Sequence, residues 1–239
     1  MTRLSTPQTC AAISQIAYQE PASAEKALKR LGMTWTKFYD VDGSQAVMCG
    51  DGYKVYVGFR GTNEIRDMLD DLNYVKVDFQ KVLSWGVRPD QIHVFGCPRV
   101  GNKAFVNGLG GRVHKGFYDA LMRLWPAIVA DLKKLDPTMP RIFAGHSLGA
   151  AMAMLANGSG HNVYRYENHL DPITFIPPRT SPRQIINSIR RGRKPTLYKH
   201  GGTVSHLSTW WHGMIHYSVG LDRLIEAQKV EARDVHNVG

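Results

Sequence analysis

The sequence predicts an α/β protein with a mainly parallel sheet that is covered by helices on both faces. Strand and helix patterns alternate along most of the chain, which is typical of parallel strands joined by helices. The stretch "RIFAG" at 141–145 is apolar after its first residue, as expected of a strand buried on both faces. A chain of 239 residues with 43% hydrophobic and 21% charged residues can bury a substantial core, and we expect one domain over 1–239.

The first part of the chain predicts two helices followed by two strands. Apolar residues recur at helical spacing over 8–18 and 22–31. The stretches "QAVMCG" (45–50) and "KVYVGFRG" (54–61) are expected to be strands joined by a short turn. The next segment, "NEIRDMLDDL" (63–72), has apolar residues at positions i, i+3, i+4 and i+7, so it predicts an amphipathic helix.

The rest of the chain continues the alternation. Helices are predicted at about 78–86, 102–108, 117–135 and 150–157, the third interrupted or kinked near Pro126. Strands are predicted at 92–96, 141–145 and 162–168.

The charge is strongly basic and unevenly distributed. The chain has 30 Lys and Arg against 20 Asp and Glu, a formal net charge of +10, and no acidic residue from Pro172 to Leu221. Such a face can attract an anionic membrane surface or an acidic substrate, or it can be a solvated rim. The basic run lacks the interleaved aromatic residues of a single-strand-binding groove, so no nucleic-acid partner is expected.

The cysteines and apolar runs bear on compartment. Cys10, Cys49 and Cys97 are too few for a disulfide framework, and their apolar neighbours predict buried free thiols. No apolar run is long enough to cross a membrane, and the N-terminus resembles an amphipathic helix more than a secretion signal. We expect a cytoplasmic protein, or one exported without a recognisable signal peptide.

The stretch "GHSLG" (145–149) matches the G-x-S-x-G pattern of a serine nucleophile. Such a serine must stand clear of the sheet on a tight turn between a strand and a helix, which is what "RIFA" before it and "AAMAMLAN" after it predict. Gly145 and Gly149 would relieve the crowding at Ser147. The N–H of Leu148, at the start of the helix, would be one donor to the oxyanion.

Five stretches together resemble the class 3 lipases, the family of the fungal triacylglycerol lipases. They are "VYVGFRGTNEIRDMLDDLN", "VFGCPRVGNKAF", "RVHKGFYDAL", "GHSLGAAMAMLA" and "YRYENHLDPITFIPP", and the resemblance covers about residues 10–221. It implies an α/β-hydrolase fold with a Ser-Asp-His triad. It also implies that Thr62, after "FRG", supplies a second oxyanion donor, and that the helix at about 62–74 is a mobile lid. The amphipathic pattern fits such a lid and equally fits an ordinary surface helix.

The resemblance also assigns the acid and the base. Asp171 matches the family's acid at the end of its strand, where it would hold the imidazole tautomer. The family's terminal pattern of a His followed by Tyr and Leu matches His212, with Tyr217 and Leu221 in the corresponding places. His216 is the main alternative base, and His200 and His206 are weaker ones. Trp211 stands before His212 where family members often have an acid.

One block departs from the family's order. In the family, "FGxPRVGN" follows the nucleophile helix and precedes the Asp strand, whereas here it comes first, within about 81–110. We infer that a helix-strand-helix block has been relocated in sequence. Because a sheet depends on neighbours in space, strand 92–96 is expected to lie beside strand 141–145 all the same. The helix "KVLSWGV" is expected to pack near the end of helix 149–157.

These observations favour a serine carboxylic ester hydrolase, a lipase or esterase, acting on lipid or lipid-like esters. A phospholipase A1, a thioesterase or an acyltransferase on the same fold remain open, as does an inert lipid-binding protein. No metal or other cofactor is expected, because no His or Cys cluster has ligand spacing. The expected partners are the ester substrate and, transiently, a lipid–water interface.

Overall fold

The computed structural model describes residues 4–61, 76–79, 86–159, 161–169, 171–176, 199–209 and 212–237. Several predictions lie outside these residues. They are the lid-like helix at 62–74 with Thr62, the helix "KVLSWGV" apart from its last two residues, the basic run before Lys199, and Trp211.

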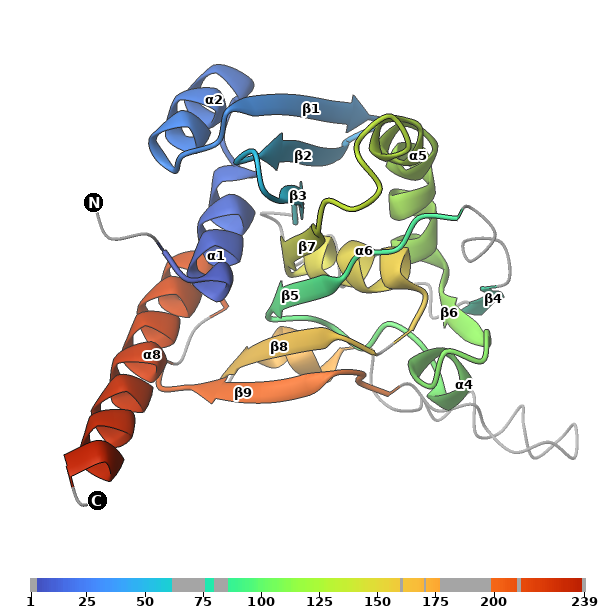
Figure 1. Ribbon diagram of the computed structural model, residues 1–239. Helices are drawn as coiled ribbons and strands as arrows, with labels where there is room; N and C mark the ends of the chain where they lie inside the picture. Colours follow the sequence, from blue (N-terminus) through green and yellow to red (C-terminus); the bar gives the residue numbers. More distant parts are fainter. Residues whose placement is uncertain are drawn as a thin grey trace, which may run out of the picture.

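The described strands form one large mixed sheet and one small one (Figure 1). The large sheet has seven strands in the order β1-β2-β3-β7-β5-β8-β9, and β4 pairs with β6 in the small sheet. The pairs β1-β2 and β2-β3 are antiparallel, and all later pairs of the large sheet are parallel. The predicted mainly parallel sheet is therefore confirmed. The strands are β1 (Trp35–Val41), β2 (Ser44–Gly50), β3 (Val55–Phe59), β4 (Lys76–Asp78), β5 (Gln91–Phe95), β6 (Arg112–His114), β7 (Arg141–His146), β8 (Val163–Asn168) and β9 (Thr203–Leu207).

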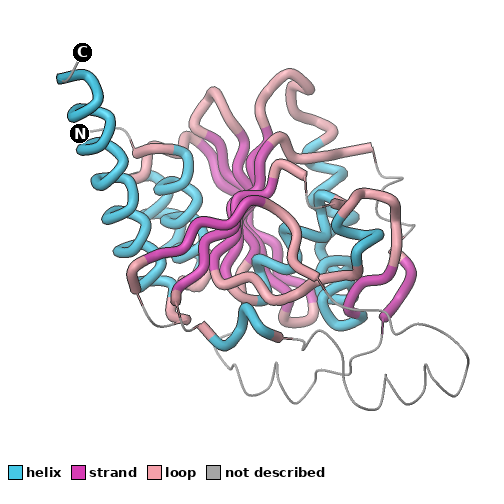
Figure 2. The backbone as a smooth tube through the Cα atoms, turned by 90° about the horizontal axis from the view of Figure 1, so that it is seen from below, coloured by secondary structure: helices cyan, strands magenta, loops and turns pink. Residues whose placement is uncertain are grey.

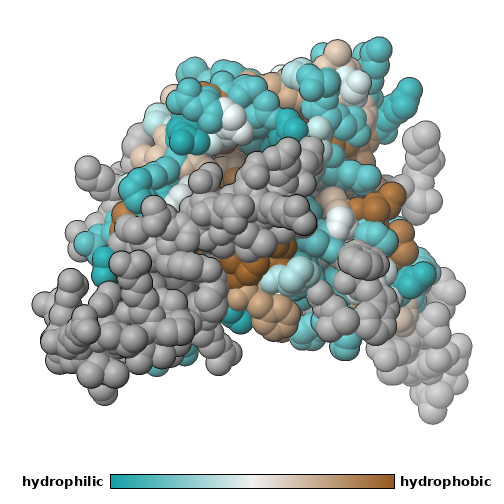
Figure 3. All heavy atoms as spheres, turned by 180° about the vertical axis from the view of Figure 1, so that it is seen from behind, coloured by the Kyte–Doolittle hydropathy of each residue, from teal (hydrophilic) through white to brown (hydrophobic). Residues whose placement is uncertain are grey.

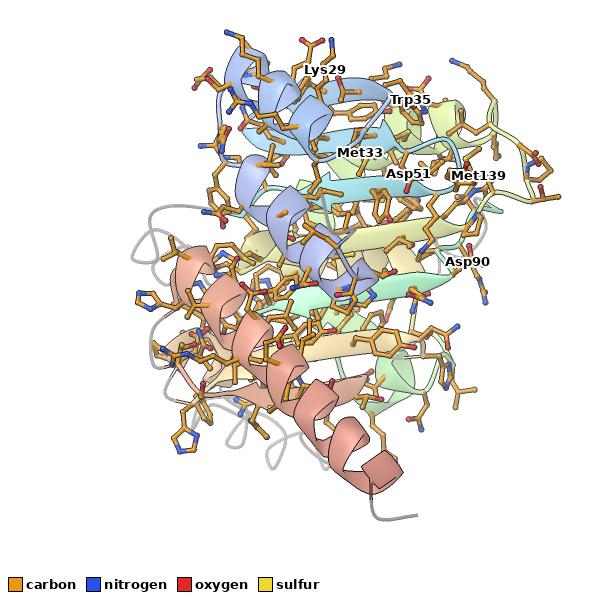
Figure 4. All side chains as sticks on the ribbon, turned by 60° about the vertical axis from the view of Figure 1, so that its left-hand side comes forward. Lys29, Met33, Trp35, Asp51, Asp90 and Met139 are labelled. Carbon is orange, nitrogen blue, oxygen red and sulfur yellow. The ribbon has the colours of Figure 1, made fainter. Side chains whose placement is uncertain are left out.

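Helices cover both faces of the large sheet, whose strands fan out with the usual twist (Figure 2). Helices α1, α2 and α8 pack on one face, while α5 and α6 pack on the other. Figure 4 shows α8 and α1 lying together across the strands, and Gln8 of α1 donates to Asp222 of α8 at 2.9 Å. The helices are α1 (Thr6–Ile16), α2 (Pro21–Arg30), α4 (Lys103–Val106), α5 (Lys115–Leu132), α6 (Leu148–Asn157), α8 (Met214–Asn237) and the 3-10 helix η2 (Pro172–Phe175).

Alternating side chains on the strands divide the interior into two cores. On β7, Phe143 faces the core under α5 and α6, and its neighbours Ile142 and Ala144 face the core under α1 and α8. This period of two is what a strand buried on both faces requires. Cys10, Cys49 and Cys97 are buried free thiols, as predicted. On the face seen in Figure 3, hydrophilic residues cover much of the described surface, and a hydrophobic area shows near its centre.

Strand β5 lies at the position that the sequence predicted for it. Strand β5 pairs in parallel with β7, from Gln91 opposite Ile142 to Phe95 opposite His146, and its other edge pairs with β8. The prediction that strand 92–96 lies beside strand 141–145 is confirmed. The chain thus crosses from β3 to β5, returns through α5 to β7, and crosses again through α6 to β8. Helix α6 ends at Gly158 in the left-handed conformation, which turns the chain out of the helix.

Sequence patterns missed some elements. Residues 76–78 form strand β4, which pairs with β6 and was not predicted, while most of the helix predicted at about 78–86 lies outside the described residues. Strands β1 and β9 were not anticipated, since neither carries a strong apolar run and each lies at an edge of the sheet. Among the described helices, none is both long and apolar enough to cross a membrane.

Candidate active site

The turn from β7 into α6 holds Ser147 in a strained conformation. Its φ of 58° and ψ of −122° lie where side chains are rarely tolerated, and its N–H donates to the Phe95 carbonyl at 3.0 Å. The two glycines of the motif make this turn possible. A Cβ at Gly145 would overlap the backbone of Gly149, and a Cβ at Gly149 would overlap the Phe59 carbonyl of β3. The predicted strand–turn–helix context of Ser147 is therefore present.

The surroundings of Ser147 offer donors for a negative charge. Leu148 is the first residue of a ten-residue helix, so its N–H belongs to the helix end that attracts anions. Gly61, which precedes Thr62, lies against the same turn, because a Cβ there would be 2.5 Å from the His146 carbonyl oxygen. Ser147 itself is fully buried.

Asp171 and His212 form a buried pair. His212 Nδ1 lies 2.6 Å from Asp171 Oδ2, and the two residues are 0% and 8% exposed. Asp171 also caps η2, accepting from the Ile173 N–H at 2.8 Å through Oδ1. The hydroxyl of Tyr217 donates to Oδ2. Burial alone would raise the pKa of Asp171, but His212, Tyr217 and the Ile173 N–H together lower it, so the carboxylate is ionised.

The alternative bases lie elsewhere. The described contacts of the Asp171 carboxylate are with His212, Tyr217 and Ile173, and none is with His216, which is half-buried. His200 donates through Nε2 to the Thr174 carbonyl at 2.6 Å, and His206 is exposed on β9. Of the four histidines considered, only His212 is paired with Asp171.

The end of β5 lies against both the Ser147 turn and the buried Asp171–His212 pair. Phe95, the last residue of β5, accepts the Ser147 N–H, and Gly96 follows with a φ of 57°. A Cβ at Gly96 would lie 2.7 Å from Asp171 Oδ2, 2.9 Å from the Tyr217 hydroxyl and 3.0 Å from His212 Cε1. Glycine is therefore required at the end of β5. The segment Phe95–Gly96 contacts both the turn at Ser147 and the Asp171–His212 pair.

The model of the family described as lipase (class 3) matches residues 56–200. The chain belongs to the class 3 lipase family. The match spans β3, the nucleophile elbow and the strand that leads to Asp171. It agrees with the resemblance drawn from the sequence motifs.

Two individual relatives are lipases of Rhizomucor and Rhizopus species. A lipase of Rhizomucor miehei is 32% identical over 156 residues, and one of Rhizopus niveus is 28% identical over 121 residues. The matches cover 63% and 49% of this chain but only 34% and 24% of the relatives. The chain thus spans about a third or less of the curated relatives that it matches.

Solved structures support the fold. The Rhizomucor miehei triacylglyceride lipase has a TM-score of 0.56 at 18% identity, covering 84% of this chain and 78% of that one. The lipase of Rhizopus microsporus var. chinensis has a TM-score of 0.51 at 18% identity, with 84% and 72% covered. The predicted α/β-hydrolase fold is confirmed.

Two residues at this candidate site have roles that the sequence did not indicate. Tyr217 entered only as part of the terminal pattern, yet its buried hydroxyl donates to Asp171 and accepts from the Asn168 N–H at 3.3 Å. Tyr18 lies just after α1, far from Ser147 in the sequence. Its hydroxyl is 2.8 Å from Nδ1 of His146, the residue before Ser147. No local signal in the sequence marks either contact.

Proposed function

We propose that this member of the class 3 lipase family is a carboxylic ester hydrolase that acts on lipid or lipid-like esters through an acyl-enzyme on Ser147. The observation that carries the proposal is the buried Asp171–His212 pair, which the Phe95–Gly96 corner joins to the strained turn at Ser147. A buried carboxylate, an imidazole and a serine at a strand-to-helix turn are the components of nucleophilic acyl transfer. The curated relatives named lipases are consistent with it.

The hydrogen bonds of His212 suit a general base. Nδ1 bonds to Asp171, so Nδ1 carries the proton and Nε2 keeps its lone pair. Nε2 is buried and has no hydrogen-bond partner within the described ranges. In the proposed reaction the Ser147 hydroxyl oxygen bonds to the acyl carbon while its proton moves to Nε2. That proton then goes to the departing alcohol.

The second half of the reaction repeats the first with water. His212 removes a proton from water, whose oxygen attacks the acyl carbon, and the proton returns to the Ser147 oxygen as the acid leaves. Asp171 stays ionised throughout and stabilises the imidazolium. The Leu148 N–H and Thr62 are the proposed donors to the oxyanion of both tetrahedral intermediates.

Access to Ser147 requires movement, because the serine is fully buried. We assign this movement to the amphipathic segment at about 62–74, acting as a lid that opens at a lipid–water interface. Its apolar residues, Ile65, Met68, Leu69 and Leu72, would then face lipid. A lid of this kind predicts higher activity on an emulsified ester than on the same ester in monomeric solution.

The test combines covalent labelling with a substrate panel. Wild type is expected to react with a fluorophosphonate probe at Ser147 and to hydrolyse p-nitrophenyl esters, whereas Ser147→Ala should do neither. Ser159→Ala, at the turn after α6, is the matched control and should behave as wild type. Adding an emulsified triglyceride, a phospholipid, a thioester and an alcohol acceptor separates the lipase from the phospholipase, thioesterase and acyltransferase alternatives. Folded wild type that leaves the probe and every ester unreacted would exclude the proposal.

A further inference from the structure

A chain of hydrogen bonds runs behind the site and uses none of the reacting atoms. The Gly61 N–H donates to the Tyr18 hydroxyl, which lies 2.8 Å from His146 Nδ1. On the other side of that ring, His146 Nε2 lies 2.5 Å from the main-chain carbonyl oxygen of His212. Three remote segments are thereby linked, namely the end of β3, the turn after α1 and the approach to α8.

The direction of each bond follows from the chemistry of its ends. A carbonyl oxygen only accepts, so His146 Nε2 must carry a proton and donate to it. Burial, and next the charge on His212, lower the pKa of His146 to about 3, so its ring is neutral at ordinary pH. A neutral ring with a proton on Nε2 accepts at Nδ1, and Tyr18 therefore donates its hydroxyl proton there.

This arrangement holds His212 at two points. Asp171 holds its ring through Nδ1, and His146 holds its main chain just before α8 begins at Met214. The rings of His146 and His212 also pack 4.5 Å apart at an angle of 33°. If Asp171 alone held the His212 ring, the backbone of His212 could still shift. The bond from His146 to the His212 carbonyl oxygen opposes that shift.

At its other end, this series of hydrogen bonds reaches Gly61, which directly precedes the proposed oxyanion donor Thr62 in the sequence. Gly61 has no room for a side chain, since a Cβ there would overlap the Tyr18 hydroxyl. Thr62 follows directly. Arg60 lies over the Tyr18 ring with its guanidinium carbon 5.9 Å from the centroid, which adds a second contact from the same segment.

We propose that Tyr18 and His146 are positioning residues that hold the main chain of His212 and the main chain of Gly61 in one arrangement. The proposal rests on the proposed ester hydrolase function. Neither residue touches the substrate, so both act through His212 and Gly61. A loss of about tenfold in kcat with KM nearly unchanged is what the loss of one such hydrogen bond predicts.

The test variant is Tyr18→Phe, which removes one oxygen atom. The matched control is Tyr166→Phe, because the Tyr166 hydroxyl also lies within hydrogen-bond distance of a buried histidine, 3.2 Å from His93 Nδ1. Both variants should lose similar thermal stability. Only Tyr18→Phe should lose kcat on p-nitrophenyl esters, whereas equal kcat in the two variants would overturn the proposal.

A second measurement does not depend on catalysis. The proton shared by His212 Nδ1 and Asp171 should give a strongly downfield ¹H NMR signal, whose identity is checked by its loss in His212→Gln. We expect Tyr18→Phe to shift or broaden this signal and Tyr166→Phe to leave it in place. An unchanged signal in Tyr18→Phe would overturn the positioning role. A shifted signal in a protein without esterase activity would uphold the positioning role and reject the proposed function instead.

His146→Gln and His146→Leu extend the test to the second residue. Glutamine retains an N–H that can donate to the His212 carbonyl, and leucine has none. If His146→Leu does not fold, Tyr18→Phe and His146→Gln still decide the matter. The expected order of kcat is wild type, then His146→Gln, then His146→Leu, and a reversed order would contradict the proposed bond.

Discussion

Two tyrosine–histidine pairs among the described residues differ in what the second ring nitrogen of the histidine contacts. In the pair of Tyr166 and His93, the remaining nitrogen of His93 lies 3.3 Å from Gln91, two residues away on the same strand. In the pair of Tyr18 and His146, the remaining nitrogen of His146 bonds to the main chain of His212, 66 residues away. The hydrogen bonds of the Tyr166–His93 pair stay within the adjacent strands β5 and β8. Those of the Tyr18–His146 pair connect segments that are far apart in the sequence.

The position along the strands explains this difference. His93 lies in the middle of β5, where its neighbours are other strand residues and the rings of Tyr164 and Tyr166 stack on it at 4.9 and 6.0 Å. His146 is the last residue of β7, where the chain leaves the sheet and loops converge. In open parallel sheets, sites form beyond the carboxyl ends of the strands. A tyrosine–histidine hydrogen bond therefore contributes to packing within the sheet at His93, and to the alignment of the candidate site at His146.

The largest expected contrast is between the histidines at the two places. His212→Gln should lower kcat/KM for ester hydrolysis by more than about a thousandfold, as expected for the loss of a base that acts together with its serine. His93→Gln should keep kcat/KM within about twofold and lower only the free energy of unfolding. Ester assays with urea denaturation on the same samples give both quantities. A comparable loss of activity in the two variants would remove the distinction drawn between these regions.

The next contrast uses two glycines with positive φ. Gly96→Ala would push a methyl group against Asp171, Tyr217 and His212, whereas a Cβ at Gly43, with a φ of 75°, meets nothing within 4 Å. Both variants should lose about 1 to 3 kcal/mol of stability from backbone strain. Only Gly96→Ala should also lower kcat, by about a hundredfold, because the acid and base would be displaced. If Gly43→Ala lowers kcat as much, the end of β5 has no special place in the site.

The pH dependence of stability provides a smaller test. Burial, with a lesser effect of the charge on Lys54, lowers the pKa of His93 from 6.5 to about 4. Above pH 6.5 this histidine is neutral in both states. Between pH 6.5 and 4 only the unfolded chain binds the proton, so stability falls as the pH falls. Each such histidine contributes up to about 1.4 kcal/mol per pH unit.

The variant His93→Gln should therefore reduce the slope of unfolding free energy against pH by up to about 1.4 kcal/mol per unit. His114 and His146 retain their contributions, since burial lowers their pKa values to about 4 and about 3. Urea titrations at pH 7, 6 and 5 measure the slope. An identical slope in wild type and His93→Gln would show that His93 is accessible to protons in the folded protein.

The smallest expected effect is that of Tyr217→Phe, which removes a hydroxyl from the carboxylate rather than from a histidine. Asp171 would keep its bonds to His212 and to the Ile173 N–H, so we expect kcat to fall by about fivefold. The pKa of Asp171, which is now lowered, should rise towards its ordinary value. Stability present above pH 3.8 would then be lost at a higher pH than in wild type. A fall in kcat beyond a hundredfold would give Tyr217 a larger role than we assign.

Much of the site could be predicted because its residues lie in short, distinctive motifs. The tight turn at Ser147 needs small residues two positions before and after the serine. Gly145 and Gly149 are these residues, so the whole requirement lies within five consecutive residues. The spacing of the family's His–Tyr–Leu pattern favoured His212 over His216, and the bond from His212 to Asp171 depends on the fold. Tyr18 could not be found at all, because its contact with His146 joins residues 128 positions apart.

The sequence by itself determined the alternation of helices and strands, the strained serine turn and membership of a family, since each depends on residues that are neighbours in the chain. The resemblance further led to the expectation that strand 92–96 lies beside strand 141–145 and that Asp171 pairs with His212. Only the tertiary structure decided that β8 lies on the other side of β5, and that Tyr18 and His146 lie behind that pair. The physical reason is that hydrogen bonds between strands and between buried side chains depend on distance in space. A relocated block can therefore fill the same position whenever its connections are long enough to reach it.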